Sequence, residues 1–395
     1  MASGHGIFRR RHGMILRAST RARSRPWASL PAEIRLRIIE GVAQQKHAGW
    51  ASLASVYKEW QFVIAQENFR RLKLRPSCLD DFERLVVRHR HLIRHILLEI
   101  EFPRYSCRNC NRDTSVSEIN REHLSISSGI SKLLRILGAW ESAQQRDEAL
   151  TTGDQLPNGL TLELNAYSPS DSEHWFKNYH FQTEVDDGNN DNDDKYKPHD
   201  PAHGWIDGQQ VLPPPATAFQ RLFPNHPILF DSLQFEDIPP VGSITRLVIP
   251  RGLRRSFHSV SLLELLRNMS AVEHLVFEPW RQWDVESRER YDSEQGWVPE
   301  FEAARVVDPR IGAAFASRSC DLEQLSVSYM VNAELLQHGS RHRERIDALL
   351  YLAGTAALRM PKLRDLAIWD GREGNACAFI YHTDRHYAHV TWRGT

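Results

Sequence analysis

The chain has 395 residues, enough for two or three domains, and its 41% hydrophobic and 25% charged residues are typical of a globular protein. Fifty Lys and Arg residues balance fifty Asp and Glu residues, so overall charge favours neither nucleic acid nor a membrane surface as a partner. No stretch approaches the roughly 18–20 apolar residues that cross a bilayer, and five scattered cysteines indicate a reducing compartment, the cytoplasm or the nucleus, rather than a disulfide framework.

The first segment, residues 1–26, is rich in arginine and contains no acidic residue. We expect it to be a disordered basic tail. A mitochondrial presequence and a basic localisation patch have a similar composition, so both remain alternatives.

Residues 27–75 form the second segment, which we predict to be a compact helical unit. In "SLPAEIRLRIIEGV" (29–42), Pro31 suits the first turn of a helix and Glu33 lies favourably near its positive end. Apolar residues recur every three or four positions through 51–74, which predicts a further helical run. A unit of this size cannot bury all its apolar side chains internally. A partner, or the domain that follows, should cover the remainder.

The order "W-x-x-LPxEI-x-x-x-I" over 27–38, followed by "LxxVYKEW" over 53–60, resembles the F-box. Members of that family use this helical motif to dock on the Skp1 adaptor of a cullin-based ubiquitin ligase. The pair Tyr57 and Lys58 stands where many members have Cys-Arg or Ser-Arg. The resemblance implies that Skp1 binds Leu30, Pro31, Glu33, Ile34, Ile38, Leu53, Val56, Trp60 and Ile64.

Five hexamers in the rest of the chain share the pattern apolar-polar-polar-apolar-x-apolar. They are "IRHILL" (93–98), "ITRLVI" (244–249), "VEHLVF" (272–277), "LEQLSV" (322–327) and "LRDLAI" (363–368). Their fourth and sixth positions alternate as in a strand. Amphipathic helical stretches precede four of them, at 79–92, 259–269, 311–318 and 345–360.

Two further stretches complete the predicted architecture: "GLTLELNAYS" (159–168) alternates as a strand, and 379–395 predicts a closing hairpin. Helix–turn–strand units bury their apolar faces by stacking. The predicted fold is therefore α/β: a small N-terminal helical F-box followed by an irregular leucine-rich-repeat-like α/β solenoid with parallel strands. The repeat domain comprises 76–182 and 213–395.

Residues 183–212 separate the two parts of this domain. They are rich in Asp, Asn and Gly before they run into "VLPPPA", and they contain almost no aliphatic residue. Such a segment buries too little apolar surface to offset its ordering entropy, which predicts a disordered acidic and proline-rich insertion.

The region after the F-box also resembles the uncharacterised region that follows the F-box in a group of fungal F-box proteins. The stretches that carry this resemblance are "LTLELNAYSPSDSEHWFKNY", "VEHLVFEPWRQW" and "HVTWRGT". The resemblance implies no activity.

Nothing in the sequence predicts catalysis, a cofactor or a metal site. The phosphate-binding, dinucleotide-binding, metalloprotease and serine-hydrolase motifs are all missing. Cys107 and Cys110, in "CRNC", have the spacing of half a zinc site. Because the other cysteines are distant and single, we interpret this pair as free thiols in a loop.

Histidines near the C-terminus, His382, His386 and His389, can approach one another across the predicted hairpin. The nearest carboxylate in sequence is Asp384, and we predict no metal there. The basic stretch "RGLRRSF" (251–257) is interpreted as a solvated face.

Three tryptophans follow the ends of hexamer strands: Trp280, Trp283 and Trp369. Parallel stacking would place their loops on one rim. Because Trp contributes strongly to interfaces, we assign them as candidate substrate-binding residues. The alternative for each is packing beneath its own loop.

These observations predict the substrate-recognition adaptor of a Skp1–cullin–F-box ubiquitin ligase, with no catalytic residues. Its expected partners are a Skp1-type adaptor, a cullin bound through that adaptor, and an unknown protein substrate, without nucleic acid or membrane. One alternative is an F-box scaffold outside any ligase. Another is a small-molecule or enzymatic role, which a deep polar pocket would favour.

Overall fold

A computed structural model describes residues 27–45, 49–147, 159–177, 198–224, 226–230, 234–278, 320–328, 359–372, 375–384 and 387–394, together with Phe315, Arg318 and Ala357. The chain divides into two compact units, residues 1–64 and 65–395. The predicted basic tail, residues 1–26, and the first half of the predicted insertion, 183–197, lie outside the described residues.

The first unit consists of short helices. A 3-10 turn (Trp27–Ser29) precedes α1 (Ala32–Gln45), a second 3-10 turn (Trp50–Ser55) follows, and α2 (Lys58–Arg70) begins within this unit. Its small core contains Ile39, Ala43 and Val63, packed against Trp27, Trp50 and Trp60. The helical character predicted for 27–64 is therefore present.

The helical run predicted over 51–74 needs correction at its end. α2 stops at Arg70, and "RLKL" forms strand β1 (Arg71–Leu74) instead. In these four residues Leu alternates with Arg or Lys, which suits a half-buried strand. Lys73 lies 2.9 Å from Glu99 of the neighbouring strand, so the basic positions of β1 are paired as well. The first compact unit ends at Ile64, within α2, whereas the predicted helical segment extends to residue 75.

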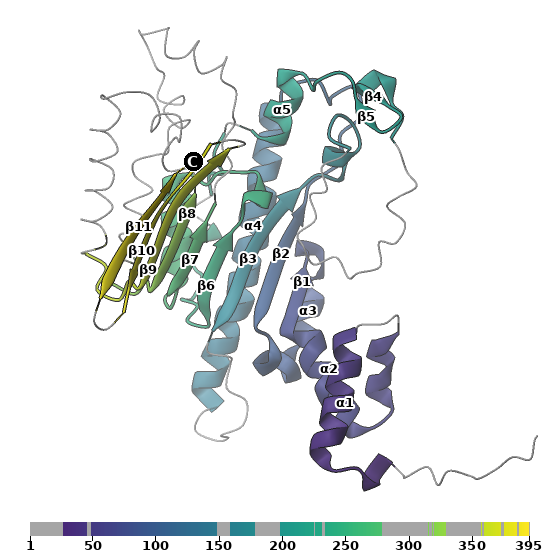
Figure 1. The fold of residues 1–395 in the computed structure, drawn as a ribbon, viewed down its shortest axis with the longest axis vertical. Helices are drawn as coiled ribbons and strands as arrows, with labels where there is room; N and C mark the ends of the chain where they lie inside the picture. The colour runs from purple at the N-terminus through teal and green to yellow at the C-terminus, as the bar shows by residue number, and fades with distance from the viewer. Residues whose placement is uncertain are drawn as a thin grey trace, which may run out of the picture. The chain divides into compact units, whose positions relative to one another are not determined.

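The second unit is built on a nine-stranded sheet whose spatial order follows the order of the strands along the chain (Figure 1). After β1 come β2 (His95–Glu101), β3 (Leu160–Tyr167), β6 (Ile244–Ile249), β7 (His274–Phe277), β8 (Gln324–Ser328), β9 (Asp365–Arg372), β10 (Asn375–Thr383) and β11 (Ala388–Gly394). Neighbours from β1 to β9 run parallel, and the last three strands are antiparallel. The predicted α/β class, the parallel strands and the closing hairpin are confirmed.

The hexamer pattern predicts the strands because its fourth residues form a ladder across the sheet. Register aligns the five fourth residues, Ile96, Leu247, Leu275, Leu325 and Leu366, in one row that also includes Leu162 of β3. All six are buried. The first residue of each hexamer is buried as well: Ile93, Val272, Leu322 and Leu363 lie just before their strands, whereas Ile244 is the first residue of β6.

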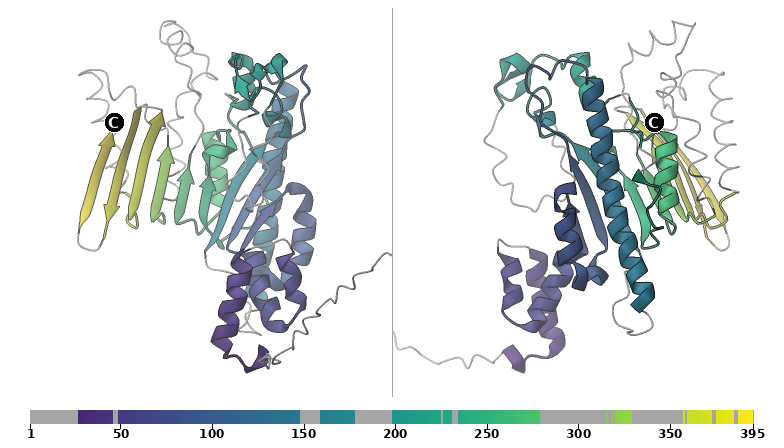
Figure 2. Two further views of the ribbon diagram at one scale, coloured as in Figure 1. Left: turned by 45° about the vertical axis from the view of Figure 1, so that its right-hand side comes forward. Right: turned by 180° about the vertical axis from the view of Figure 1, so that it is seen from behind.

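Helices α4 (Val116–Asp147) and α6 (Ser259–Asn268) lie on the same face of the sheet (Figure 2). α4 was not predicted individually, although its start carries a capping box: the Ser115 N–H donates to Glu118 at 2.9 Å, and the Glu118 N–H donates to the Ser115 hydroxyl at 3.4 Å. Its buried face contains Ile126, Ile130, Leu133, Leu134, Leu137 and Trp140.

The helical stretches expected before the hexamers have mixed outcomes. The first, 79–92, is divided into α3 (Leu79–Leu85) and a 3-10 turn (Val87–Leu92), and the second is α6. The stretches at 311–318 and 345–360 lie almost entirely outside the described residues.

The second half of the predicted insertion, 198–212, is ordered, contrary to expectation. It forms a 3-10 turn (Pro201–His203) and a two-stranded hairpin of β4 (Trp205–Ile206) and β5 (Gln209–Gln210), followed by α5 (Ala216–Leu222). Positive φ angles at Asp207 (47°) and Gly208 (87°) match the Asp-Gly turn of a tight hairpin. Trp205 is only 2% exposed, so one aromatic residue supplies the burial that aliphatic residues do not.

Candidate functional site

An exposed apolar surface is the most distinctive feature of the helical unit. Ile34 and Ile38 on α1 are 45% and 41% exposed and lie one turn apart, so they share a face of the helix. In the segment that leads into α2, Val56 is 63% exposed and Tyr57 is 59% exposed. Full burial of one such aliphatic side chain is worth roughly 1.5–3 kcal/mol, so these positions favour a partner.

A partly exposed ion pair links α1 to α2 beside this surface. The Arg35 guanidinium donates to both carboxylate oxygens of Glu59, at 3.0 and 2.7 Å, and to the Leu30 carbonyl at 2.6 Å. Hydrogen bonding from Arg35 lowers the pKa of Glu59, although burial acts in the opposite direction. The rings of Trp27 and Trp60 lie 5.9 Å apart on the packed side. The ion pair and the ring contact link the two helices, while Ile34 and Ile38 remain exposed.

The residues predicted to bind Skp1 fall into three groups. Five are exposed: Pro31, Glu33, Ile34, Ile38 and Val56. Three are half-buried: Leu30, Leu53 and Trp60. The ninth, Ile64, is 1% exposed, so it offers no surface to a partner. Three other apolar side chains of this unit, Leu36, Tyr57 and Phe62, are exposed but are not among the predicted Skp1-binding residues.

The predicted tryptophan rim finds less support. Trp280 and Trp283 lie outside the described residues. Trp369 lies within β9 rather than in a loop after it, where it is half-buried beneath the Arg251 guanidinium, 4.7 Å from the ring centroid. This cation–π contact gives Trp369 a packing role.

The basic stretch 251–257 is not the solvated face predicted from its sequence. Arg254 and Arg255 are 3% and 4% exposed. Arg254 lies 2.9 Å from Asp171, which follows β3, and Arg255 lies 3.1 Å from Glu122 of α4. Their acidic partners are distant in sequence, so composition alone gave no sign of these buried ion pairs.

A cluster of cysteine and histidine side chains lies beyond the carboxyl ends of β2 and β3. Cys107 and Cys110 occupy the turns after β2, His174 follows β3, and His203 belongs to the segment before β4. One ligand atom from each of these four residues lies within 4.8 Å of the others. Cys107 and Cys110 are free cysteines in turns, as interpreted from the sequence, but two histidines that are distant in sequence lie beside them.

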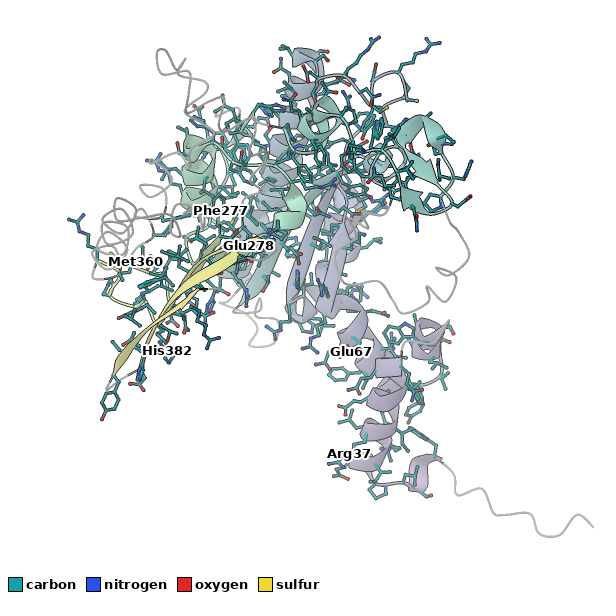
Figure 3. All side chains as sticks on the ribbon, turned by 45° about the horizontal axis from the view of Figure 1, so that its top comes forward. Arg37, Glu67, Phe277, Glu278, Met360 and His382 are labelled. Atoms are coloured by element: carbon teal, nitrogen blue, oxygen red, sulfur yellow. The ribbon has the colours of Figure 1, made fainter. Side chains whose placement is uncertain are left out.

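Sequence reasoning missed the two histidines because they stand far from "CRNC". His203 is 93 residues from Cys110 and lies in a segment expected to be disordered. The available signal was the presence of single histidines in "SEHWF" and "PAHGW", each beside an aromatic residue that could bury it. The C-terminal histidines are different: His382, near the end of β10, lies 2.6 Å from Asp365 on an exposed surface (Figure 3).

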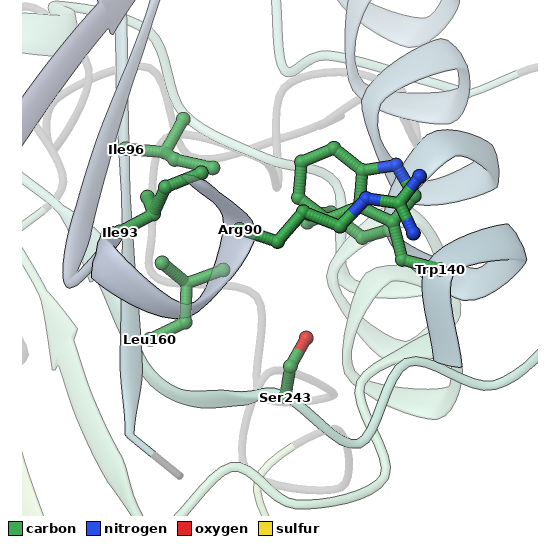
Figure 4. A pocket seen from close by; sticks show the side chains of 7 residues that line it. Arg90, Ile93, Ile96, Trp140, Leu160 and Ser243 are labelled. Carbon is green, nitrogen blue, oxygen red and sulfur yellow. The ribbon is translucent and has the colours of Figure 1, made fainter. Parts of the chain in front are cut away.

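Two cavities in the part of the chain that the structure describes bear on a small-molecule role. One holds about 10 Å³ between Trp140, Ile93 and Ser243 (Figure 4), the space of a single water molecule at most. A second, about 330 Å³, is an open polar groove near the start of α4, lined by Arg112, Glu118 and other charged residues. Neither resembles the largely apolar, enclosed pocket typical of a small-molecule site.

Comparison with known proteins gives one partial match. Residues 332–395 match DUF6546, a family of unknown function. The matched part contains β9–β11 and contains neither the helical unit nor the cysteine–histidine cluster. No curated protein and no solved structure matches the chain. Among the described residues, no helix is long and apolar enough to cross a membrane.

Proposed function

We propose that the chain is the substrate-recognition adaptor of a Skp1–cullin–F-box ubiquitin ligase, active in the cytoplasm or the nucleus. The observation that carries the proposal is the exposed apolar surface of Ile34, Ile38 and Val56 on helices fixed by the Arg35–Glu59 pair. A rigid pair of short helices with outward aliphatic side chains is pre-organised to pack against a partner helix, because little ordering entropy remains to be lost on binding.

In this proposal the sheet unit holds a protein substrate. Its strands follow chain order and the hexamers align in one ladder, which supports a leucine-rich-repeat-like arrangement. Of the two cavities among the described residues, one holds a single water molecule at most and the other is an open polar groove, which favours a protein substrate over a small molecule. The unit would supply no catalytic group; it would raise the local concentration of substrate near the ligase.

The experiment compares full-length variants in co-purification with a Skp1 homologue. Ile38→Glu combined with Val56→Glu places two charges on the exposed apolar surface, and we expect Skp1 recovery to fall at least tenfold. Val260→Glu is the matched control, because Val260 is 52% exposed on α6 of the other unit. Both proteins should keep the circular dichroism and melting temperature of the parent.

Skp1 recovery within twofold of the parent for the folded double variant would refute the docking proposal. Skp1 without cullin in the purified complex would instead favour the alternative function, an F-box scaffold outside any ligase. The cullin readout therefore separates docking on Skp1 from assembly of a ligase.

A further inference from the structure

We propose that Cys107, Cys110, His174 and His203 form a structural zinc site. Two cysteines and two histidines are a ligand set that zinc binds tetrahedrally in structural sites, with Zn–S near 2.3 Å and Zn–N near 2.0–2.1 Å. In that geometry neighbouring ligand atoms are about 3.3–3.8 Å apart. The Sγ atoms of Cys107 and Cys110 each lie 3.3 Å from His203 Nε2, and all four ligand atoms lie within 4.8 Å of one another.

The orientation of His203 supports this assignment. Its Nδ1 lies 2.8 Å from Asp200 Oδ2, and the same carboxylate oxygen lies 2.7 Å from Lys177 Nζ. A carboxylate on one ring nitrogen is the usual outer partner of a zinc-binding histidine, because it fixes the protonated nitrogen and turns the other toward the metal. His203 Nε2 then faces both sulfur atoms, although the Cys110 S–H can also donate to the Cys107 carbonyl at 3.0 Å. Both sulfurs and this ring nitrogen therefore point toward the position that a zinc ion would occupy.

His174 provides independent support. Its Nε2 is buried and has no hydrogen-bond partner within the part of the chain that the structure describes. Buried polar nitrogens normally have a partner, so each exception needs an explanation. The His174 ring lies 4.9 Å from the His203 ring, which places it at the cluster. Coordination of zinc would give this nitrogen its missing partner.

The surroundings of the site indicate a structural role. Four protein ligands complete a zinc tetrahedron and leave no open position for a substrate. A small apolar cluster of Trp175, Phe176, Leu222 and Phe223 includes Cys110 itself. The ion would join the turn after β2, the loop after β3 and the segment 198–224, which are distant in sequence. A link between distant segments removes much loop entropy from the unfolded chain.

A redox disulfide is the main competing use of a C-x-x-C pair. In thioredoxin-like proteins the reactive thiol is activated at a helix N-terminus. Here the two cysteines lie in turns ahead of α4, which begins at Val116. A disulfide would also not explain why both histidines lie beside the sulfur atoms. A zinc site predicts bound zinc in the purified protein, whereas a redox disulfide predicts none.

The test measures metal in the full-length protein, purified with reductant and without chelator. We expect about one zinc ion per chain by elemental analysis. Exchange with Co²⁺ should produce the strong visible absorption of a tetrahedral site and a sulfur-to-cobalt charge-transfer band. Asp200→Asn should weaken zinc binding about 10–100-fold, the usual effect of losing an outer carboxylate.

Matched variants assign the ligands. Cys110→Ser and His203→Asn should abolish zinc binding. Cys320→Ser and His199→Asn should retain it, because both side chains are exposed and lie outside the cluster. Should the ligand variants fail to fold, the cobalt spectrum of the parent decides alone. Less than about 0.1 zinc per chain after zinc loading and desalting, or equal zinc loss in the control variants, would overturn the site.

Discussion

Substitution of Asp171 should show how strongly the carboxyl ends of the strands depend on buried charge. Asp171 lies in the 3-10 turn after β3 (Pro169–Ser172), and Arg254 lies in the connection after β6. Their side chains are 3% and 2% exposed and their charged atoms are 2.9 Å apart. Asp171 also accepts hydrogen bonds from the Tyr105 hydroxyl at 3.2 Å and the Ser168 N–H at 3.0 Å. One carboxylate therefore holds three chain segments.

The expected loss of stability depends on which charged group each substitution leaves buried without its partner. Asp171→Asn keeps the shape but leaves the Arg254 charge buried without this carboxylate, and breaking a buried pair in this way costs about 3–5 kcal/mol. Burial lowers the pKa of Arg254, although Asp171 raises it. The guanidinium nevertheless stays charged near neutral pH, because its ordinary pKa is far above 7. Arg254→Met should cost a similar amount, because it leaves the Asp171 carboxylate uncompensated.

A double-mutant cycle separates the ion pair from general damage. Since the double variant buries no uncompensated charge, it should lose about 2–3 kcal/mol less than the sum of the two single losses. Urea unfolding of the full chain, followed by tryptophan fluorescence, resolves such differences when total stability is about 5–15 kcal/mol. Additivity within about 0.5 kcal/mol would refute the coupling and would indicate that the pair contributes only through its individual hydrogen bonds.

Two further predictions concern a buried histidine and a helical glycine. Burial and the nearby Arg255 charge lower the pKa of His226 from 6.5 to about 4, so the unfolded chain binds a proton at higher pH than the folded chain. The contribution of His226 to stability should be fully present above pH 6.5, and the free energy of unfolding should fall by roughly 2–3 kcal/mol toward pH 4. His226→Gln should flatten this part of a profile of urea midpoint against pH, and an unchanged slope would contradict the prediction. In α4, a Cβ on Gly138 would lie 2.6 Å from Pro239 Cγ, so Gly138→Ala should cost about 1–3 kcal/mol despite better helix propensity. Gly41→Ala in α1, where the Cβ meets nothing within 4 Å, should instead stabilise by about 0.5–1 kcal/mol, and thermal melts that shift both variants in the same direction would refute the comparison.

The parts of the fold that the sequence predicted are those in which a local pattern repeats. The hexamer "ITRLVI" coincides with β6, since Leu247 and Ile249 alternate toward the core and Ile244 packs just before them. β1 was missed because four residues directly after a helix continue the apolar pattern of that helix for one more turn. Period-two and period-3.6 patterns cannot be distinguished over so short a stretch.

The site residues that the sequence did not predict depend on contacts between distant segments. Arg254 looked like part of a solvated basic stretch because its acidic partner, Asp171, is 83 residues away. His203 looked like part of a disordered insertion because composition counts aliphatic residues, whereas one tryptophan and several polar contacts order this segment. Composition measures how much apolar surface a segment can bury alone. These segments are instead ordered by contacts with residues that are distant in sequence.

The helical unit has the opposite imbalance: it exposes more apolar surface than its own core can bury. Among the described residues, its core cluster contains Ile39, Ala43 and Val63 with three half-buried tryptophans, too small a core for much independent stability. Its remaining large aliphatic side chains, Ile34 and Ile38 among them, stand outside that core. A partner that covers these side chains binds the folded unit and not the unfolded one, so it should raise the apparent stability of the unit by mass action. Weak stability when free and strong stabilisation when bound are therefore two consequences of the same distribution of apolar residues, and Skp1 binding to the proposed surface should be accompanied by an increase in the melting temperature of this unit.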